Sequence, residues 1–255
     1  MYKISIQPEE IEKMPLGSFP GKIRVIDKNG IDFVRAIAYL STQRMIGFDT
    51  ETRPVFSPGQ RHNHVALLQL SGGGRAYLFR VGTMGMNRLL CSLMANPHIL
   101  KIGAAVHDDV RGLQYYRKFD AKGFIDLQKI AYEWGIRDKS VKKLAANILG
   151  VRISKSQQLS NWEAEELSAA QQMYAATDAW VCREMYLKLL QSEKHPLTPE
   201  ELNPPQPQQQ QQPKAESAQA AAAGEDKPKK KRRRRHRSKA KKAGEAAQST
   251  QQDNG

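Results

Sequence analysis

Two acidic residues close an apolar segment in the first quarter of the chain, where residues 46–54 read IGFDTETRP. Side chains two positions apart in a β-strand share a face, so Asp49 and Glu51 would project side by side. Like charges that close raise each other's pKa unless a positive group lies between them. An arginine, solvent or a metal ion could offset the repulsion. The positions of the other acidic residues in the chain indicate which of the three is expected.

Two further segments place carboxylates where elements meet. Asp108 and Asp109 follow the apolar segment 98–106, and Asp178 lies in a helical pattern four residues after Tyr174. Ligands of open α/β sheets bind beyond the strand ends, so these carboxylates could converge. Converging carboxylates with no matching His or Cys cluster suit Mg²⁺ or Mn²⁺ rather than zinc. Two such ions can activate water and stabilise the leaving oxygen of a phosphoryl displacement.

The elements that must position these residues follow from the hydrophobic pattern. Ser140 and Ser168 are suitable helix N-caps, and Gly150 is a suitable helix stop. A hairpin followed by strand–helix alternation predicts an α/β fold with a mixed sheet. The pattern predicts strands at residues 22–26, 44–50, 64–72, 76–81 and 98–106 with a short one after 123, and helices at 30–42, 86–95, 107–119, before 135, at 140–150 and at 168–193.

Residues 203–255 differ in composition from the rest of the chain. They contain no aromatic residue, and 12 of the 16 residues from Lys227 to Lys242 are Lys or Arg. Such a segment cannot bury enough apolar surface to offset its chain entropy, so we expect a folded part over residues 1–202 and a disordered tail. The tail carries 13 Lys and Arg against 5 Asp and Glu, within a chain of net charge +14. This charge predicts contact with a nucleic-acid backbone, although a solubilising extension is the alternative.

Several protein classes are disfavoured by composition. The sequence contains no run of eighteen apolar residues, so we expect no membrane span. The first residues, MYKISIQPEE, lack the apolar core of a secretory signal. Cys91 and Cys182 fit no zinc or redox spacing and suit a reducing compartment. We therefore expect a cytoplasmic protein in which both cysteines are buried.

Three segments, in order along the chain, resemble the motifs of the DEDD 3′–5′ exonucleases, in the DEDDy subclass that has a tyrosine in the third motif. They are FDTET, KIGAAVHDDVRGL and YAATD. The sequence is similar to ribonuclease D and to the Werner-type exonuclease domain over about residues 21–190. The resemblance implies a ribonuclease H-like mixed sheet flanked by helices. It also implies hydrolysis of phosphodiester bonds from a 3′ end, with release of nucleoside 5′-monophosphates.

The resemblance further implies two Mg²⁺ or Mn²⁺ ions and a role for each motif residue. Tyr174 would help to orient the attacking water. Asp108 is the alternative second-motif ligand, but the motif register favours Asp109. The implied metal ligands, also catalytic, are Asp49, Glu51, Asp109 and Asp178.

Alternatives remain open at each level. A degenerate fold could bind nucleic acid without cutting it, and a ribonuclease H-type endonuclease would cut internally. DNA and RNA are both possible substrates, and the oligomeric state is open. Asp178 could instead pair with Arg183, and Phe56 could stack on a terminal base. Candidate phosphate contacts are Arg53, Arg61, Arg75 and Lys101.

Overall fold

The computed structural model describes residues 1–56 and 63–202. The description below concerns the described residues of the unit Met1–Pro207. The predicted tail at 203–255 lies outside the described residues, as does Arg61.

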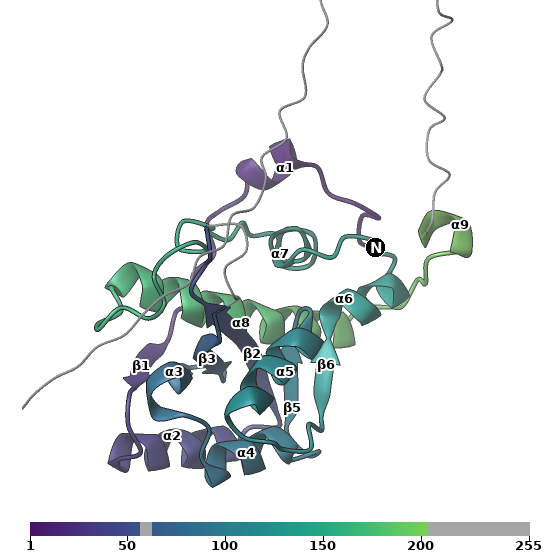
Figure 1. The fold of residues 1–255 in the computed structure, drawn as a ribbon. Coiled ribbons are helices and arrows are strands. Elements are labelled where there is room, and N and C mark those ends of the chain that lie inside the picture. Colours follow the sequence, from purple (N-terminus) through teal and green to yellow (C-terminus); the bar gives the residue numbers. More distant parts are fainter. Residues whose placement is uncertain (57–62, 203–255) are drawn as a thin grey trace, which may run out of the picture. The chain divides into compact units, whose positions relative to one another are not determined.

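A six-stranded mixed sheet forms the centre of this unit (Figure 1). Strand β3 is antiparallel to both of its neighbours, and the remaining pairs are parallel. The predicted hairpin and mixed sheet are therefore confirmed. The spatial order is β1 (Lys22–Ile26), β4 (Arg75–Phe79), β3 (Val65–Ser71), β2 (Met45–Thr52), β5 (Leu100–Gly103) and β6 (Phe124–Asp126).

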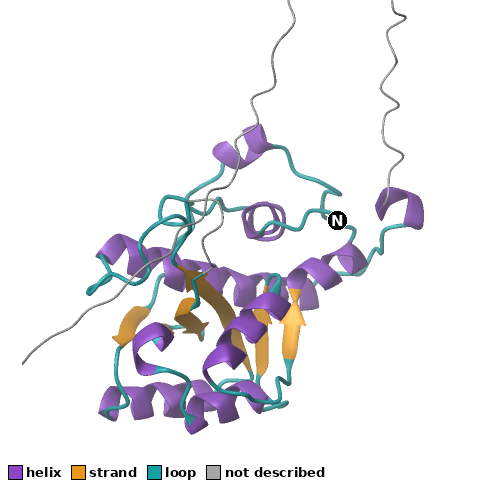
Figure 2. Cartoon of the chain, viewed as in Figure 1, coloured by secondary structure: helices purple, strands orange, loops and turns teal. Residues whose placement is uncertain are grey.

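Helices cover both faces of the sheet (Figure 2). One face packs against α2 (Ile31–Ser41), α3 (Val81–Met84), α4 (Arg88–Ala95) and α5 (Val106–Tyr116). The other face packs against the long helix α8 (Ala169–Leu190), together with α6 (Leu127–Ile130) and the 3₁₀ turn Ala131–Trp134, and α7 (Val141–Leu149) packs on α8. Because both faces are covered, every residue of β3 is buried.

The helix ends follow the predicted signals. The Ser140 and Ser168 hydroxyls accept hydrogen bonds from Lys143 N and Gln171 N, and Gly150 ends α7 with a left-handed φ of 69°. The short helices α1 (Pro8–Glu12), α3 and α9 (Pro199–Leu202) were not predicted, because four or five residues carry no helical periodicity.

The composition-based expectations have mixed outcomes. Cys91 and Cys182 are free and buried, as predicted. Within residues 1–56 and 63–202, no helix combines the length and apolar character that crossing a bilayer requires. The cytoplasmic assignment stays a prediction.

Candidate active site

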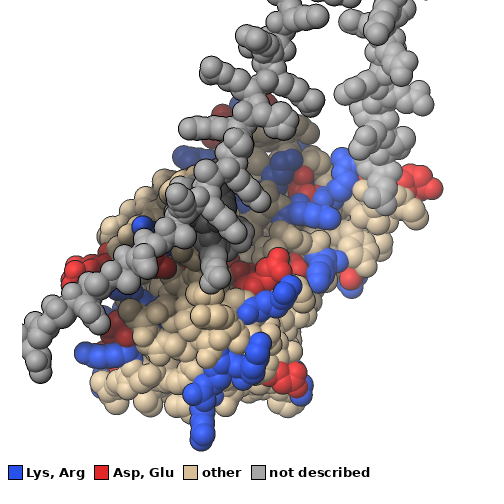
Figure 3. Space-filling model, viewed as in Figure 1, with Lys and Arg blue, Asp and Glu red and all other residues tan. Residues whose placement is uncertain are grey.

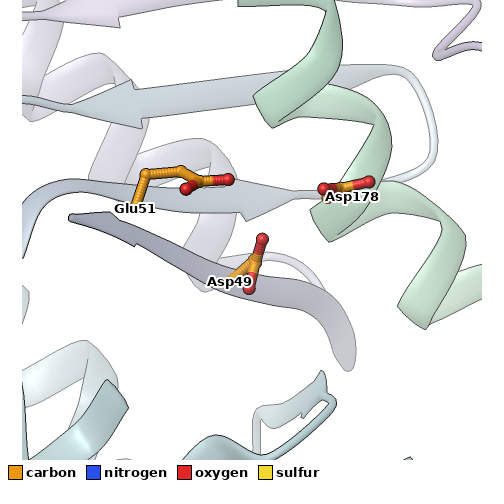
Figure 4. A group of neighbouring side chains, drawn as sticks. All are labelled: Asp49, Glu51 and Asp178. Carbon is orange, nitrogen blue, oxygen red and sulfur yellow. The ribbon is translucent and has the colours of Figure 1, made fainter. Parts of the chain in front are cut away.

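Three of the predicted carboxylates meet between β2 and α8. Asp49 and Glu51 lie on one face of β2, as strand alternation requires, and Asp178 reaches them from α8 (Figure 4). Each residue offers an oxygen atom, and these three atoms all lie within 4.8 Å of one another. The structure thus brings residues 129 positions apart, Asp49 and Asp178, into a single acidic group.

A glycine allows this close approach of helix and strand. Gly47 shares the face of Asp49 on β2, and a Cβ atom placed on it would lie 1.8 Å from the carbonyl oxygen of Ala179. Only a residue without a side chain lets the α8 backbone pack directly on β2 here. Since Ala179 follows Asp178, this contact sets the distance between the carboxylates of the two elements.

Asp109 reaches the site from the opposite face of the sheet. Thr50 lies between Asp49 and Glu51 on β2, so its side chain points toward α5, where Thr50 Oγ1 donates a 2.5 Å hydrogen bond to Asp109 Oδ1. The preferred second-motif residue is therefore next to the acidic group but outside the trio described above. Asp108, the alternative, is exposed to solvent.

The start of α5 is held in an uncommon backbone conformation. Ala105, directly before the helix, has a φ of 58°, in the left-handed region that alanine rarely adopts. Its amide nitrogen donates a 3.0 Å hydrogen bond to the buried carboxylate of Asp126. Strain of this kind persists only where neighbouring contacts impose it, and here those contacts fix the helix that carries Asp109.

Burial raises the pKa of every carboxylate in the site, and neighbouring negative charges add to the rise for Asp49, Glu51 and Asp109. The pKa of Asp49 is well above its ordinary value because of burial, followed by the charges of Asp178, Glu51 and Asp109. Burial is also the largest cause for the other three carboxylates. It raises the pKa of Glu51 to about 9, that of Asp109 to about 6, and that of Asp178 to about 7.

No basic side chain in the described part of the chain forms an ion pair with any of these four carboxylates. The alternative partner for Asp178 does not serve, because Arg183 pairs with Glu184 at 2.5 Å. Carboxylate oxygens that have no ion-pair partner in a half-buried group match the ligand preference of hard divalent cations. The donor set therefore fits Mg²⁺ or Mn²⁺.

Tyr174 lies one helical turn before Asp178 and faces the same group. Its pKa is raised far above the usual value for tyrosine, by burial first and then by the charges of Asp178 and Glu51. The phenol therefore remains protonated at neutral pH and keeps its hydroxyl hydrogen available for donation.

Sequence reasoning missed the opposite wall of the site. A hollow of about 290 Å³ joins the acidic group to residues of the loop after α7, among them Lys155 and Gln158. The positive charge of Lys155 lowers the pKa of Asp178, although burial outweighs it. A lysine in an irregular segment carries no spacing signal, so only the tertiary contact reveals it.

Gln69, inside the predicted strand 64–72, is a second residue beside the acidic group. It is paired directly with Asp49 between β2 and β3, which places both side chains on one face of the sheet. Its side chain is fully buried, and neither amide atom has a hydrogen-bond partner among the described residues. An unbonded polar group thus lies next to the central carboxylate.

The other predicted contacts have separate outcomes. The prediction that Lys101 contacts phosphate is wrong. The Lys101 side chain is fully buried, and its Nζ donates to the carbonyl oxygens of Asn96 and Ile99, at 2.7 Å each. Arg53 pairs with Glu163 at 3.2 Å. Phe56 is 76% exposed, and its role in stacking stays a prediction.

Comparison with known proteins agrees with this geometry. The chain belongs to the 3′–5′ exonuclease family, which it matches over residues 27–192. It is 31% identical over 204 residues to the bifunctional 3′–5′ exonuclease/ATP-dependent helicase WRN of Mus musculus, across 73% of this chain and 14% of that protein. It is 35% identical over 98 residues to ribonuclease D of Haemophilus influenzae, across 37% of this chain and 24% of that protein.

Solved structures show the same fold. Trypanosoma brucei RNase D in complex with RNA U12 superposes with a TM-score of 0.60 at 20% identity, over 69% of this chain and 64% of that chain. Escherichia coli RNase D superposes with a TM-score of 0.59 at 22% identity, over 66% of this chain and 44% of that chain. The predicted ribonuclease H-like fold is thus confirmed. The chain spans only 14% to 26% of the first curated relatives, so most of each relative lies outside the match.

Proposed function

We propose that this protein is a metal-dependent 3′–5′ exonuclease of the DEDDy subclass, which shortens nucleic acids from the 3′ end and releases nucleoside 5′-monophosphates. The observation that carries this proposal is the convergence of Asp49, Glu51 and Asp178 within one family fold. The position of Tyr174, one turn from Asp178, supports the subclass.

The carboxylates would hold two ions, Mg²⁺ or Mn²⁺. Asp49 and Asp178 suit one ion, and Asp49, Glu51 and Asp109 suit the second. Such ions supply an activated water and stabilise the leaving oxygen of the displacement. The hydrogen bond from Thr50 orients Asp109 toward this group from the far side of β2.

Two residues outside the carboxylates have roles in this proposal. The protonated hydroxyl of Tyr174 hydrogen-bonds the attacking water and so fixes its direction of approach. Lys155 lines the same hollow as the carboxylates and carries the charge that attracts a phosphate. A cation opposite an acidic group lets the polyanionic strand approach the carboxylates.

We infer that residues 1–202 form the exonuclease domain and that the tail, residues 203–255, binds the nucleic-acid backbone. On the face shown in Figure 3, Lys and Arg side chains of the described unit are interspersed with Asp and Glu. The basic block of Lys227 to Lys242 is therefore the densest positive segment available to a strand. Its sequence-independent attraction would raise the local concentration of substrate.

One experiment tests the activity and separates it from the alternatives. Matched 5′-labelled DNA and RNA, single- and double-stranded, are incubated with the protein and Mg²⁺ or Mn²⁺, and the product ladders are read. An RNase D neighbour solved with RNA U12 supports including RNA. We expect stepwise shortening from the 3′ end, lost in Asp178→Asn and retained in the exposed control Asp108→Asn.

Each alternative gives a different ladder. Binding without any shortening would indicate a non-catalytic module, and internal fragments would indicate an endonuclease. Undiminished shortening by Asp178→Asn would refute the assignment of the site.

A further inference from the structure

A buried amide lies directly beside the central carboxylate of the acidic group. Gln69 belongs to β3, and the register of the sheet pairs it with Asp49 on β2. Residues that are directly opposite in an antiparallel pair have Cβ atoms about 4.5–5.5 Å apart, and their side chains share one face of the sheet. The Gln69 side chain therefore extends from the same face as Asp49 and Glu51, the face that α8 covers.

Both ends of this amide lack a hydrogen bond. The Gln69 side chain is fully buried, and neither Nε2 nor Oε1 has a partner among the described residues. Within residues 1–56 and 63–202, the one other buried side-chain atom in this condition is the indole nitrogen of Trp162. Buried polar groups in proteins are almost always bonded, and an unpaired one costs free energy. The unpaired amide of Gln69 therefore needs an explanation beyond packing.

The neighbours of Gln69 in the sheet offer a polar partner on one side. On the β4 side the directly opposite residue is Leu78, which is apolar and fully buried. Along β3 itself, the Ser71 hydroxyl already donates to the carbonyl oxygen of Gly72 at 2.9 Å. On the β2 side the opposite residue is Asp49, whose carboxylate forms no ion pair with a basic side chain in the described part of the chain. Asp49 is therefore the acceptor that the register offers to the amide.

The chemistry of the two groups sets the direction of such a bond. An ionised carboxylate only accepts hydrogen bonds, whereas the nitrogen of a side-chain amide carries two N–H donors. The two oxygens of a carboxylate accept up to about four bonds, so an oxygen that binds a cation keeps room for a donor. Hydrogen bonds to an ionised group are also shorter and stronger than bonds between neutral groups. Gln69 Nε2 can therefore hold Asp49 while the oxygens of Asp49 bind ions.

Gln69 lies behind the site and has no access to a substrate. Figure 4 shows the carboxylate of Asp49 beside those of Glu51 and Asp178. All three line the hollow of about 290 Å³, whereas Gln69 is fully buried and is not among the described residues that line it. Any effect of the amide on the reaction must therefore pass through Asp49.

We propose that Gln69 is a positioning residue that donates a hydrogen bond from Nε2 to Asp49 when divalent ions are bound, an inference that rests on the proposed function. Asp49 is the carboxylate assigned to both ions, so its orientation affects the binding of each. Hydrogen-bond partners that orient a metal ligand change metal affinity by roughly 10- to 100-fold when they are removed. The amide thus governs the affinity for ions rather than the affinity for the nucleic-acid strand.

The test measures ion binding in a variant that removes the amide alone. Gln69→Met keeps an unbranched side chain of similar length, and calorimetry on the full chain measures its Mn²⁺ affinity without any substrate. We expect Mn²⁺ to bind roughly 10- to 100-fold more weakly than to wild type. Leu70→Met is the matched control, because Leu70 is equally buried and its side chain points to the opposite face of β3. The Mn²⁺ affinity of this control should equal that of wild type.

Thermal unfolding separates positioning from a structural role. Gln69→Met removes an unpaired amide from the core, so in EDTA the variant should melt at no lower temperature than wild type. A residue that holds the fold together would show the opposite behaviour. A lower melting temperature of Gln69→Met in EDTA would therefore overturn the proposal, whatever its Mn²⁺ affinity.

Two further measurements follow the amide through Asp49. In trimming assays of Gln69→Met, the Mn²⁺ concentration that gives the half-maximal rate should rise by the same factor as the dissociation constant. The KM for the strand at saturating Mn²⁺ should stay unchanged, because the amide does not reach the hollow. By nuclear magnetic resonance, the side-chain amide signal of Gln69 should shift when the diamagnetic ion Mg²⁺ is added to wild type, but not when it is added to Asp49→Asn.

The failure of this inference differs from the failure of the proposed function. A Gln69→Met variant that binds Mn²⁺ as tightly as wild type, or an amide signal that is indifferent to Mg²⁺, would overturn the role of Gln69 and leave the exonuclease intact. If wild type binds Mn²⁺ but shortens no strand, the proposed function fails, and the calorimetric comparison still decides the role of Gln69. A wild type that binds no Mn²⁺ would overturn both.

Discussion

Removing divalent ions and raising the pH should destabilise this protein through its acidic site. The folded-state pKa values of Asp109, Asp178 and Glu51 all lie above their ordinary values, with burial as the largest cause. The folded protein therefore binds more protons than the unfolded chain, and the free energy of unfolding falls as pH rises. The fall runs from about pH 4 through the folded pKa values of about 6, 7 and 9.

The size of the effect can be worked from one residue. The pKa of Asp109 rises from 3.8 to about 6, a difference of roughly 2 units at about 1.4 kcal/mol each, so its ionisation costs about 3 kcal/mol. Replacing it in Asp109→Asn removes that cost. For a domain of this size, the variant should melt roughly 6–12 °C above wild type at pH 8 in EDTA.

Divalent ions should reverse the order of the two proteins. Saturation at a thousand times the dissociation constant stabilises a folded protein by about 4.1 kcal/mol, which exceeds the cost of about 3 kcal/mol that the variant avoids, and only the wild type has the full ligand set. The assay is thermal unfolding at pH 5, 7 and 9 with EDTA or Mn²⁺, with Asp27→Asn, on an exposed residue outside the site, as the matched control. A wild-type stability that is independent of pH in EDTA, or an Asp109→Asn variant less stable than wild type there, would refute the reasoning.

Three further outcomes are expected. Gly47→Ala should lower the free energy of unfolding measured in urea by about 1–3 kcal/mol, because the added methyl group collides with Ala179. Gly74→Ala is the control and should leave it unchanged, because no atom lies within 4 Å of the added methyl group. Gln69→Leu removes a buried amide that has no hydrogen-bond partner among the described residues, so its free energy of unfolding in EDTA should equal that of wild type. The same variant should lose nucleotide release, and unchanged release would show that the amide is dispensable. Deleting residues 204–255 should leave turnover of short oligonucleotides intact and weaken binding at low salt, and an identical salt dependence would exclude the tail from binding.

The acidic site could be predicted from the sequence because each motif places its residues through spacing within a single strand or helix. Strand alternation alone places Asp49 and Glu51 together, and helical spacing alone aligns Tyr174 with Asp178. The order of the three motifs then implied that the segments meet. None of these inferences needed a distance between elements.

The features that escaped prediction all depend on contacts between distant segments. Lys155 lies in an irregular loop, and its place beside Asp178 follows from how that loop packs against α8. Residues 1–20 carry no periodic pattern that places them, so the position of Leu16 follows from the backbone hydrogen bonds of Pro15 and Gly17 to Arg152. The prediction that Lys101 contacts phosphate is wrong because its side chain is buried and its ammonium group donates to the backbone carbonyl oxygens of Asn96 and Ile99, a pairing that no sequence spacing indicates.

The fold imposes the carboxylate geometry whether or not ions are bound. Gly47 brings α8 onto β2, and the buried residues on both faces of the sheet hold the helices, so Asp178 cannot move away from Asp49 to relieve repulsion. The packing energy of a core of this size exceeds the cost of a few repelling charges, so the helix is not displaced. The repulsion raises the pKa values of the carboxylates instead. Binding of divalent ions must therefore release protons as well as form bonds, and the apparent affinity should strengthen as pH rises from 5 to 9. The same increase in pH weakens the ion-free fold, so ion binding and folding are coupled through these four side chains.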